Sequence, residues 1–261
     1  MKYQTTESII IKQMDFKESD QIITFLTKDQ GKRSGILRGV KKIKSKHAGA
    51  SEPFTYGQIH YVEKANTELV QIRKFDPIDH FYSIRQVYDK ILYATYLTEL
   101  IHLCMVDPQE SHLYFDLLLI ALQTLQHTNS CVQVKIQFEK DLLLILGILP
   151  NLEQCIQCHQ SLWESGSQAL PKLKRFDSHQ MDYGAGGLRC SDCLVQTPTT
   201  VPLSPGTISY LRYLEKQTKT ANNKVHPTQQ NIRELDGLFL NYFRYHLGKA
   251  PKSHTLLHSL C

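Results

Sequence analysis

Short apolar segments separated by turns make up the first eighty residues of the chain. The segments are rich in β-branched and aromatic residues, which favours strands over helices. A turn at Lys28–Gly31, with glycine at its end, separates two of them. The pattern predicts five strands that include Glu7–Ile11, Gln21–Thr27, Ser34–Val40, Phe54–Glu63 and Leu69–Ile72. Five strands in about 75 residues match the size of an OB-type barrel, although other small β-barrels share the strand count.

The apolar positions change to helical spacing after Phe81. Bulky or small apolar residues recur at intervals near 3.6 residues at Val87, Ile91, Ala94 and Ile101. The residues Asp107–Glu110 combine a capping side chain, proline and glutamate, so they predict the start of a second helix. Leu113–Leu125 is apolar on nearly every face and is expected to lie centrally in the core. A third helix is expected over residues 131–146.

The last hundred residues are expected to be irregular first and helical afterwards. Residues 151–200 hold both cysteine pairs and show no regular period. Ser204–Pro205 predicts a helix start, and Asn231–Leu247 is an amphipathic helix that ends at Gly248. The tail from Lys249 is expected to be loose. We therefore predict an α+β multidomain fold with a barrel at 1–80, a helical domain at 81–150, a cysteine module at 151–200 and packing helices at 201–261.

Four of the seven cysteines form two Cys-x-x-Cys pairs. Each pair can hold a metal ion with two thiolates, and two pairs complete the tetrahedron of a structural zinc site. The 31 residues between the pairs exceed the compact spacing, but closing a longer loop costs only about 0.6 kcal/mol per doubling of its length. The segment is poor in apolar residues, so a metal would serve as its core. We predict one structural zinc ion bound by Cys155, Cys158, Cys190 and Cys193.

Redox dithiols or unrelated surface cysteines are the alternative interpretation of the two pairs. A thioredoxin-type dithiol follows a strand and opens a helix, and neither pair has that context. His159 and His179 lie between the pairs and offer imidazoles in place of one thiolate. Four thiolates leave no open position on the metal, so we expect no catalysis there. Cys104 and Cys131 lie in apolar helical segments, where small buried residues are expected.

Positive charge concentrates between Gln30 and Ser51. The chain holds 30 Lys and Arg against 25 Asp and Glu, a net charge of +5. This segment alone carries seven positive charges and no acid, so the rest of the chain sums to −2. Without a polyanionic partner these side chains would only repel one another, and we therefore expect a nucleic acid. The predicted phosphate contacts are Lys32, Arg33, Arg38, Lys41, Lys42, Lys44 and Lys46.

A solvated charged loop is the alternative interpretation, because most charge runs are of that kind. Residues 41–47 link the third and fourth predicted strands, and a loop on a small barrel can follow a phosphate backbone from there. Gly39 and Gly49 permit a close approach to a ligand but equally suit an ordinary loop. Aromatic residues at strand spacing usually belong to the core, so none is singled out for base stacking among Phe16, Phe25, Phe54, Tyr56 and Tyr61.

Motifs of several enzyme and membrane classes are absent from the sequence. There is no phosphate-binding P-loop, no dinucleotide-binding glycine fingerprint after a strand, no zinc-protease motif and no nucleophile elbow. Glu18–Asp20 and Gly184–Gly187 are interpreted as turns. The longest apolar runs are far shorter than the ~18 residues of a membrane span, and the first residues lack the apolar core of a signal peptide. We expect a cytoplasmic protein with no membrane contact, no small-molecule substrate and no enzymatic activity.

Several segments also have the order and spacing of one bacterial protein family. The N-terminal segments are Asp15–Ile22, Thr27, Gly31–Lys32, Arg38–Lys42, Lys44–Lys46, Gly49 and Glu52–Phe54. Further on they are Tyr93–Leu100, Leu146–Pro150 with the Cys155 and Cys158 pair after it, and Tyr242–Gly248. In these segments the chain resembles the RecO family of recombination mediators over nearly its whole length.

That resemblance implies an N-terminal OB-fold, a helical domain and a zinc module. It implies binding of single- and double-stranded DNA, annealing of complementary strands and a cytoplasmic, nucleoid-associated location. It also implies help in loading RecA onto DNA coated by single-stranded-DNA-binding protein, together with the partner RecR. The tail at Pro251–Thr255 is less basic than is usual in the family.

Three other functions fit the same residues. An RNA-binding or ribosome-associated zinc protein would use the same basic loop, and the affinities for matched RNA and DNA strands would separate the two. A hydrolase or transferase with an unrecognised site would show metal-dependent turnover of nucleic acid or nucleotides. A protein–protein adaptor would bind its partner through the helical domain and leave the basic loop inert.

Overall fold

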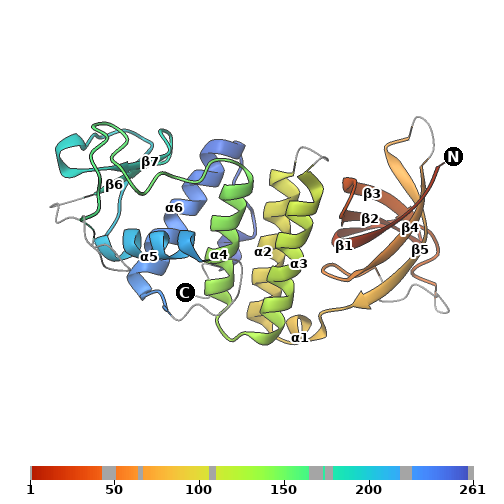
Figure 1. Cartoon of the computed structure of the whole chain (residues 1–261). Coiled ribbons are helices and arrows are strands. Elements are labelled where there is room, and N and C mark those ends of the chain that lie inside the picture. Colours follow the sequence, from red (N-terminus) through yellow and green to blue (C-terminus); the bar gives the residue numbers. More distant parts are fainter. Residues whose placement is uncertain are drawn as a thin grey trace. The chain divides into compact units, whose positions relative to one another are not determined.

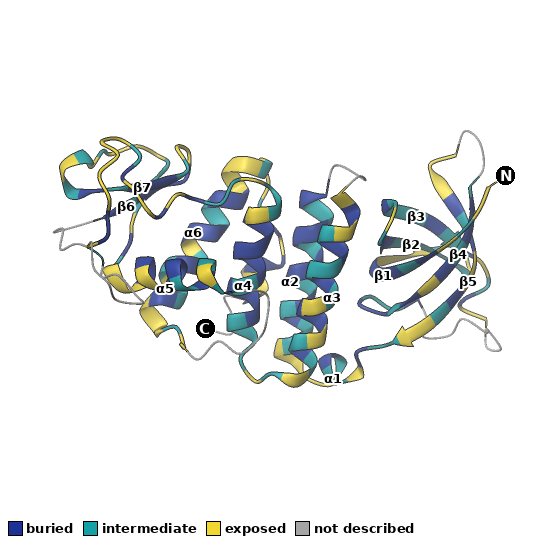
Figure 2. Ribbon diagram, viewed as in Figure 1, coloured by how far each residue is buried: buried dark blue, intermediate teal, exposed yellow. Residues whose placement is uncertain are grey.

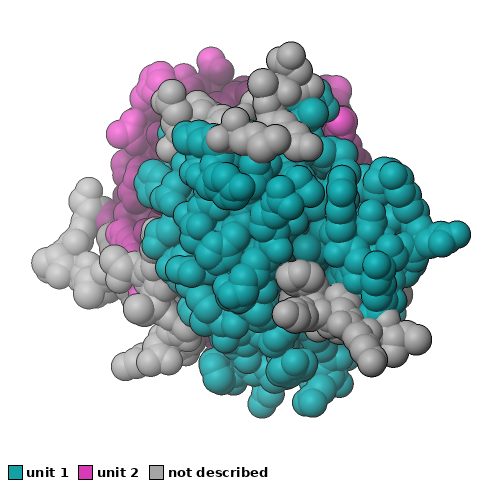
Figure 3. Space-filling view, turned by 90° about the vertical axis from the view of Figure 1, so that its right-hand side faces the viewer, with its two compact units in different colours: residues 1–131, 251–261 teal, residues 132–250 magenta. Residues whose placement is uncertain are grey.

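The chain folds into two compact units. The computed structural model describes residues 2–42, 51–63, 67–105, 110–164, 173, 179–217 and 225–257. Unit 1 comprises residues 1–131 together with 251–261, and unit 2 comprises residues 132–250 (Figure 3). None of the helices in these described ranges is long and apolar enough to cross a membrane.

A closed five-stranded barrel opens unit 1 (Figure 1). The strand order is β1-β2-β3-β5-β4, with β3 and β5 parallel and the other neighbours antiparallel. The strands are β1 Lys2–Phe16, β2 Asp20–Thr27, β3 Gly31–Leu37, β4 Tyr56–Glu63 and β5 Leu69–Asp79. The five predicted strands are confirmed, and the domain is an OB-fold. The first strand is much longer than Glu7–Ile11 because it pairs with β4 along its first half and with β2 along its second.

Alternating side chains of the strands fill the barrel with an apolar core (Figure 2). Its buried members are Ile10, Ile23, Phe25, Leu37, Val40, Ile59, Tyr61, Val70, Ile72 and Phe75. Gly57 is needed on β4, because a Cβ atom there would lie 2.3 Å from the carbonyl oxygen of Asp76 on β5. The backbones of β4 and β5 therefore come very close at this irregular point of their register.

Three helices follow the barrel in unit 1: α1 Tyr82–Arg85, α2 Tyr88–Cys104 and α3 Ser111–His127. The predicted start at Asp107–Glu110 falls largely outside the described residues. Helix α3 lies against β1, β2 and β3, and the hydroxyl of Ser111 donates to the carbonyl of Lys28. The expected central burial of the helix is wrong for one face, because Ile120 is 39% exposed. The predicted helical stripe starts with Val87, which is 44% exposed because it precedes the helix.

The segment from Pro251 onward belongs to unit 1, and the predicted looseness of the tail is wrong for residues 251–257, while residues 258–261 lie outside the described part of the chain. Pro251, Ser253 and His254 are buried, and a short helix, α7, spans His254–Leu257. The carboxylate of Glu99 on α2 accepts hydrogen bonds from the backbone N–H groups of Lys252 and Ser253, both at 2.9 Å. A partner more than 150 residues away in the sequence therefore orders this segment.

Unit 2 contains the helices α4 Cys131–Ile145, α5 Pro205–Lys216 and α6 Gln229–Leu247. The predicted start of α5 is confirmed, because the hydroxyl of Ser204 accepts from the backbone N–H of Thr207 and proline follows as the first helical residue. Helix α6 ends as predicted at Gly248, whose φ of 66° is the left-handed conformation that glycine adopts without strain.

A small three-stranded sheet lies in the region that was expected to be irregular. Its strands are β6 Gln180–Asp182, β7 Gly187–Arg189 and β8 Thr200–Pro202, in the order β7-β6-β8. A short 3-10 helix, η2, spans Ser191–Cys193. The turn between β6 and β7 contains Gly184, Ala185 and Gly186 as predicted, with Gly186 at a φ of 76°, but Gly187 is already the first residue of β7.

Candidate metal centre and nucleic-acid surface

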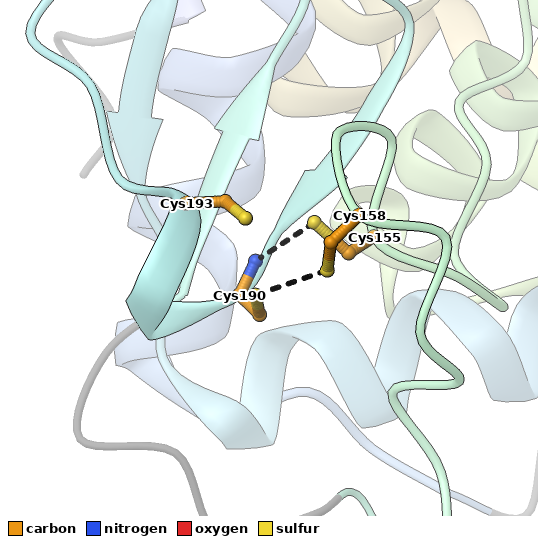
Figure 4. Close-up of side chains that lie close together, drawn as sticks. All are labelled: Cys155, Cys158, Cys190 and Cys193. Atoms are coloured by element: carbon orange, nitrogen blue, oxygen red, sulfur yellow. Dashed lines mark hydrogen bonds between the residues drawn. The ribbon is translucent and has the colours of Figure 1, made fainter.

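Four cysteine thiols meet beside the small sheet (Figure 4). Their sulfur atoms all lie within 4.8 Å of one another, and two of them, in Cys158 and Cys190, are 3.7 Å apart. A disulfide needs about 2.05 Å, so this pair is not bonded. A tetrahedral site with metal–sulfur bonds of about 2.3 Å places its sulfurs about 3.8 Å apart. The spacing therefore fits one metal ion held by Cys155, Cys158, Cys190 and Cys193.

Backbone turns deliver the two pairs to one place. A tight turn after Cys155 is closed by the N–H of His159, which donates to the Cys155 carbonyl at 2.9 Å. The second pair follows β7, and the N–H of Cys190 donates to the Cys155 sulfur at 3.4 Å. Burial opposes ionisation of Cys155, but N–H groups of Cys158, Cys190 and Gln157 outweigh it and lower the pKa of that thiol to about 6.

The other thiols show why a cation belongs between them. Burial and hydrogen bonds with the thiols of Cys190, Cys158 and Cys155 raise the pKa of Cys193 to about 12, and repulsion from the negative charge of Cys155 adds to this shift. A bound metal ion would offset that repulsion, and four thiolates around it leave no open position for a substrate. Among the described residues the ligand group contains neither His159 nor His179, so the imidazole alternative finds no support in this geometry.

Sequence reasoning missed a carboxylate that holds the turn before the second cysteine pair. Asp182 on β6 pairs with Arg189 on β7, whose guanidinium donates twice at 3.0 and 3.1 Å. The same carboxylate accepts from the N–H groups of Gly184 and Ala185 and from the hydroxyl of Thr199. Burial alone would raise the pKa of Asp182, but these bonds lower it. The only sequence signal was an aspartate immediately before a glycine-rich turn.

The predicted phosphate contacts separate into three groups. Arg38, Lys41 and Lys42 are exposed on the turn that follows β3, and we call these three side chains the basic turn. Lys32 is half-buried and donates to the carbonyl of His102 at the end of α2, at 2.7 Å. Burial lowers the pKa of this lysine. Arg33 is half-buried near Tyr61, and its Nε is buried without a hydrogen-bond partner. Lys44 and Lys46 lie outside the described residues.

A shallow cavity of about 480 Å³ lies beside the basic turn, on the outside of the barrel. It covers the parallel seam where Ile36 of β3 faces Gln71 of β5. Its lining is Ile36, Arg38, Thr67, Glu68, Leu69, Val70 and Gln71. The cavity therefore combines apolar side chains, which suit a flat base, with one exposed guanidinium, which suits a phosphate.

Most of the aromatic side chains considered for stacking belong to the core. Phe25, Phe54 and Tyr61 are at most 7% exposed, so a base cannot reach their ring faces. Phe16 and Tyr56 are half-buried. The general expectation that aromatics at strand spacing are core residues is thus met by three of the five.

Two family models together match nearly the whole chain. The family model for the recombination protein O N terminal matches residues 1–81, and the model for its C terminal matches residues 85–255. Three proteins named DNA repair protein RecO are each similar to this chain over 98% of its length. Those of Bacillus pumilus, Desulfatibacillum aliphaticivorans and Dehalococcoides mccartyi are 27%, 28% and 28% identical and are covered over 93%, 96% and 95% of their own lengths. The chain therefore belongs to the RecO family and has a role in DNA repair and recombination.

Proposed function

We propose that this protein binds single- and double-stranded DNA through the outer face of its barrel and anneals complementary strands. We propose further that it helps load RecA onto DNA coated by single-stranded-DNA-binding protein, together with RecR. The observation that carries the proposal is the exposed basic turn of Arg38, Lys41 and Lys42 next to a cavity on the OB-fold. OB-folds bind oligonucleotides with this type of surface, formed by strand faces and the loops beside them.

Strand annealing needs no covalent chemistry. Two single strands repel each other through their phosphates, and cations that neutralise part of this charge let the strands approach and pair. A contact to phosphate carries no sequence information, so the same surface accepts any pair of complementary strands. We accordingly assign no catalytic residue. The barrel of residues 1–80 would hold DNA, and the helical segments 81–150 and 201–261 would contact protein partners.

We also propose that the four cysteines bind one structural zinc ion. Thiolates are the ligands that zinc prefers in closed tetrahedral sites, and the sulfur spacing fits its bond length. Elemental analysis of protein purified without chelator should give about one zinc per chain. Protein that is folded throughout unit 2 and holds no metal would contradict this assignment.

DNA binding is tested with a labelled single-stranded oligonucleotide over a series of salt concentrations. The variant Arg38→Ala/Lys41→Ala/Lys42→Ala removes the basic turn, so the slope of log K against log salt should become shallower by about 2, at ~0.7 per lost phosphate contact. The matched control Arg233→Ala/Arg244→Ala/Lys249→Ala removes the same charge from exposed positions of unit 2.

The proposal predicts that only the first variant loses affinity and slope. Equal losses in both variants would show a general effect of net charge, and no loss in the first would remove the basic turn from the DNA site. A matched RNA strand in the same assay checks the remaining class of ligand, since tighter binding of RNA would favour an RNA-binding protein.

A further inference from the structure

The basic turn is attached to the turn that joins β1 and β2. The backbone N–H of Gly39 donates to the carboxylate of Asp20 at 2.9 Å, and the N–H of Lys41 donates to the carbonyl of Ser19 at 3.1 Å. Gly39 has a φ of 68°, so the chain reverses direction at the point where Asp20 holds it. Two segments about twenty residues apart in the sequence thus form one hydrogen-bonded unit.

A second set of contacts ties both sides of the segment 43–50 to the same strands. The amide nitrogen of Gln21 donates to Asp15 at 3.1 Å, and its amide oxygen accepts from the hydroxyl of Ser51 at 2.9 Å. Asp15 in turn binds the ammonium of Lys41 at 2.6 Å. Lys41 therefore binds Asp15 and Ser51 binds Gln21, and these two partners are hydrogen-bonded to each other.

The two carboxylates contact the basic turn in different ways. Asp20 binds a backbone N–H and so fixes the course of the chain; the charge of Arg38 acts on it from nearby, but Asp20 does not hold the ammonium of Lys41. Asp15 binds the ammonium group that a DNA phosphate would need. Both side chains of this pair are exposed, at 39% for Lys41 and 63% for Asp15, so a phosphate oxygen can take the place of the carboxylate. An exposed ion pair of this kind is weak enough to exchange.

We propose that these two aspartates act in opposite directions on DNA binding: Asp20 positions the basic turn for phosphates, and Asp15 competes with phosphate for Lys41. The inference rests on the proposed DNA-binding function. Asp20 also accepts from the hydroxyl of Ser19, so it lies at the centre of the turn-to-turn contact. Without an acceptor at position 20 the N–H of Gly39 loses its partner, and the three cations no longer share one fixed geometry.

The substitutions that separate these roles keep or remove one property at a time. Asp20→Asn retains an oxygen that can accept from Gly39, whereas Asp20→Ala retains none. Asp15→Asn retains an oxygen for Gln21 but loses the charge that holds Lys41. Asp76→Asn is the matched control, because Asp76 forms a similar exposed pair with Lys74, at 2.7 Å, on another strand of the same barrel.

The experiment measures binding of a single-stranded oligonucleotide across the salt series. Asp15→Asn should bind about three- to tenfold more tightly and add about 0.7 to the slope, as one extra phosphate contact would. Asp20→Ala should bind more weakly, and its slope should become shallower by about 0.7–1.4, as expected for the loss of one or two phosphate contacts. Asp20→Asn should bind with nearly the wild-type affinity and slope. In a Lys41→Ala background the effect of Asp15→Asn should vanish, because the two residues act through one contact.

Several results would overturn the inference. If Asp15→Asn binds DNA no more tightly than Asp76→Asn, the gain in affinity comes only from the change in net charge. If Asp20→Ala and Asp20→Asn bind DNA equally well, Asp20 does not position the basic turn. The Asp15 variants test the competition with phosphate independently, even if Asp20→Ala fails to fold. The triple variant of the basic turn identifies the level of failure. If that variant binds DNA like wild type, the basic turn is not the DNA site and the proposed binding surface is wrong. If the triple variant loses affinity and only the aspartate variants bind like wild type, this inference alone is wrong.

Discussion

The barrel of unit 1 and the helical core of unit 2 are stabilised by different means. The barrel interior is a continuous cluster of apolar side chains, and burial of apolar surface is not directional. Helix α4 of unit 2 also buries Lys135 and Glu139, at 5% and 0% side-chain exposure. The ammonium of Lys135 lies 3.0 Å from the carboxylate of Glu139 and 2.8 Å from that of Asp236 on α6. The barrel should tolerate small losses gradually. Unit 2 adds this buried ion cluster to its apolar core, so it should respond strongly to the loss of one member of the cluster, because a buried charge left alone is very costly.

The metal centre gives the strongest form of this dependence. Structural zinc sites contribute about 10–16 kcal/mol of apparent binding free energy in small peptides, and that energy is spent on folding. Cys190→Ser, or removal of the metal by a chelator, should abolish hydrogen-exchange protection across β6, β7 and the turn after Cys155. Protection of the barrel strands should remain unchanged. The effect is expected to exceed that of any other single substitution described below.

A matched substitution separates metal binding from the mere loss of a thiol. Cys131 is half-exposed and lies outside the four-cysteine group, so Cys131→Ser should leave exchange in unit 2 as it is in wild type. Equal deprotection by both serine variants would argue against a metal centre. Deprotection that reached the barrel strands would instead break the contrast between the two units.

The ion cluster of α4 is expected to show the next largest effect. Lys135→Met removes the cation that lies 3.0 Å from the buried carboxylate of Glu139 and should destabilise unit 2 by about 3–5 kcal/mol. The attraction of Glu139 and Asp236 raises the pKa of Lys135 against the effect of burial, so this lysine remains charged in the fold. Trp163, the only tryptophan of the chain, lies in unit 2 and reports denaturant unfolding of that unit by its fluorescence.

A conservative substitution in the barrel core shows how strongly unit 1 responds, for comparison with the ion cluster of unit 2. Ile23 is 1% exposed, and Ile23→Val removes one methylene group at a cost of about 0.5–1.5 kcal/mol. Hydrogen exchange of the barrel strands measures this change. Adding Glu139→Gln to Lys135→Met should recover part of the lost stability, because the buried carboxylate charge that lost Lys135 is removed as well. If Lys135→Met costs no more than Ile23→Val, the ion cluster is not the weak point of unit 2.

The sequence predicted those parts of the fold that depend on local or periodic signals. The five barrel strands followed from alternating apolar and β-branched residues, and the start of α5 followed from Ser204 and Pro205. The four-cysteine group was also predicted, because the Cys-x-x-Cys spacing is typical of metal-binding sites. Three-residue strands such as β6, β7 and β8 are too short to show any period, so the small sheet was missed.

Contacts between distant residues account for most of the remaining differences. The order of the C-terminal tail comes from Glu99, which no local pattern around residue 251 reveals. Lys32 stands in a dense run of cations, yet its ammonium donates to a carbonyl seventy residues away. The bond between Asp20 and Gly39 likewise joins two turns that the sequence separates. A charge count thus located the basic segment, but only the structure shows which cations are free to meet a phosphate.

Glu215 on α5 should give a small effect, which should shrink to near zero at acidic pH. Burial, followed by the charge of Glu153, raises the pKa of Glu215 to about 7, whereas the ordinary value is 4.5. The folded state therefore holds this proton more tightly than the unfolded chain. The resulting stability is fully present below about pH 4.5 and is lost as the pH rises through about 7. Glu215→Gln mimics the protonated side chain and removes this pH dependence.

At pH 8 the Glu215→Gln variant should be more stable than wild type by about 1 kcal/mol, since the side chain is half-exposed and solvent screens part of the effect. The difference should shrink to near zero at pH 5. Unfolding by denaturant, followed by Trp163 fluorescence at both values, measures it directly. Glu164→Gln changes an exposed carboxylate of the same unit and should show no such trend. A gain at pH 8 would extend the contrast between the units, because unit 2 would then carry a polar group that works against its own stability under neutral conditions.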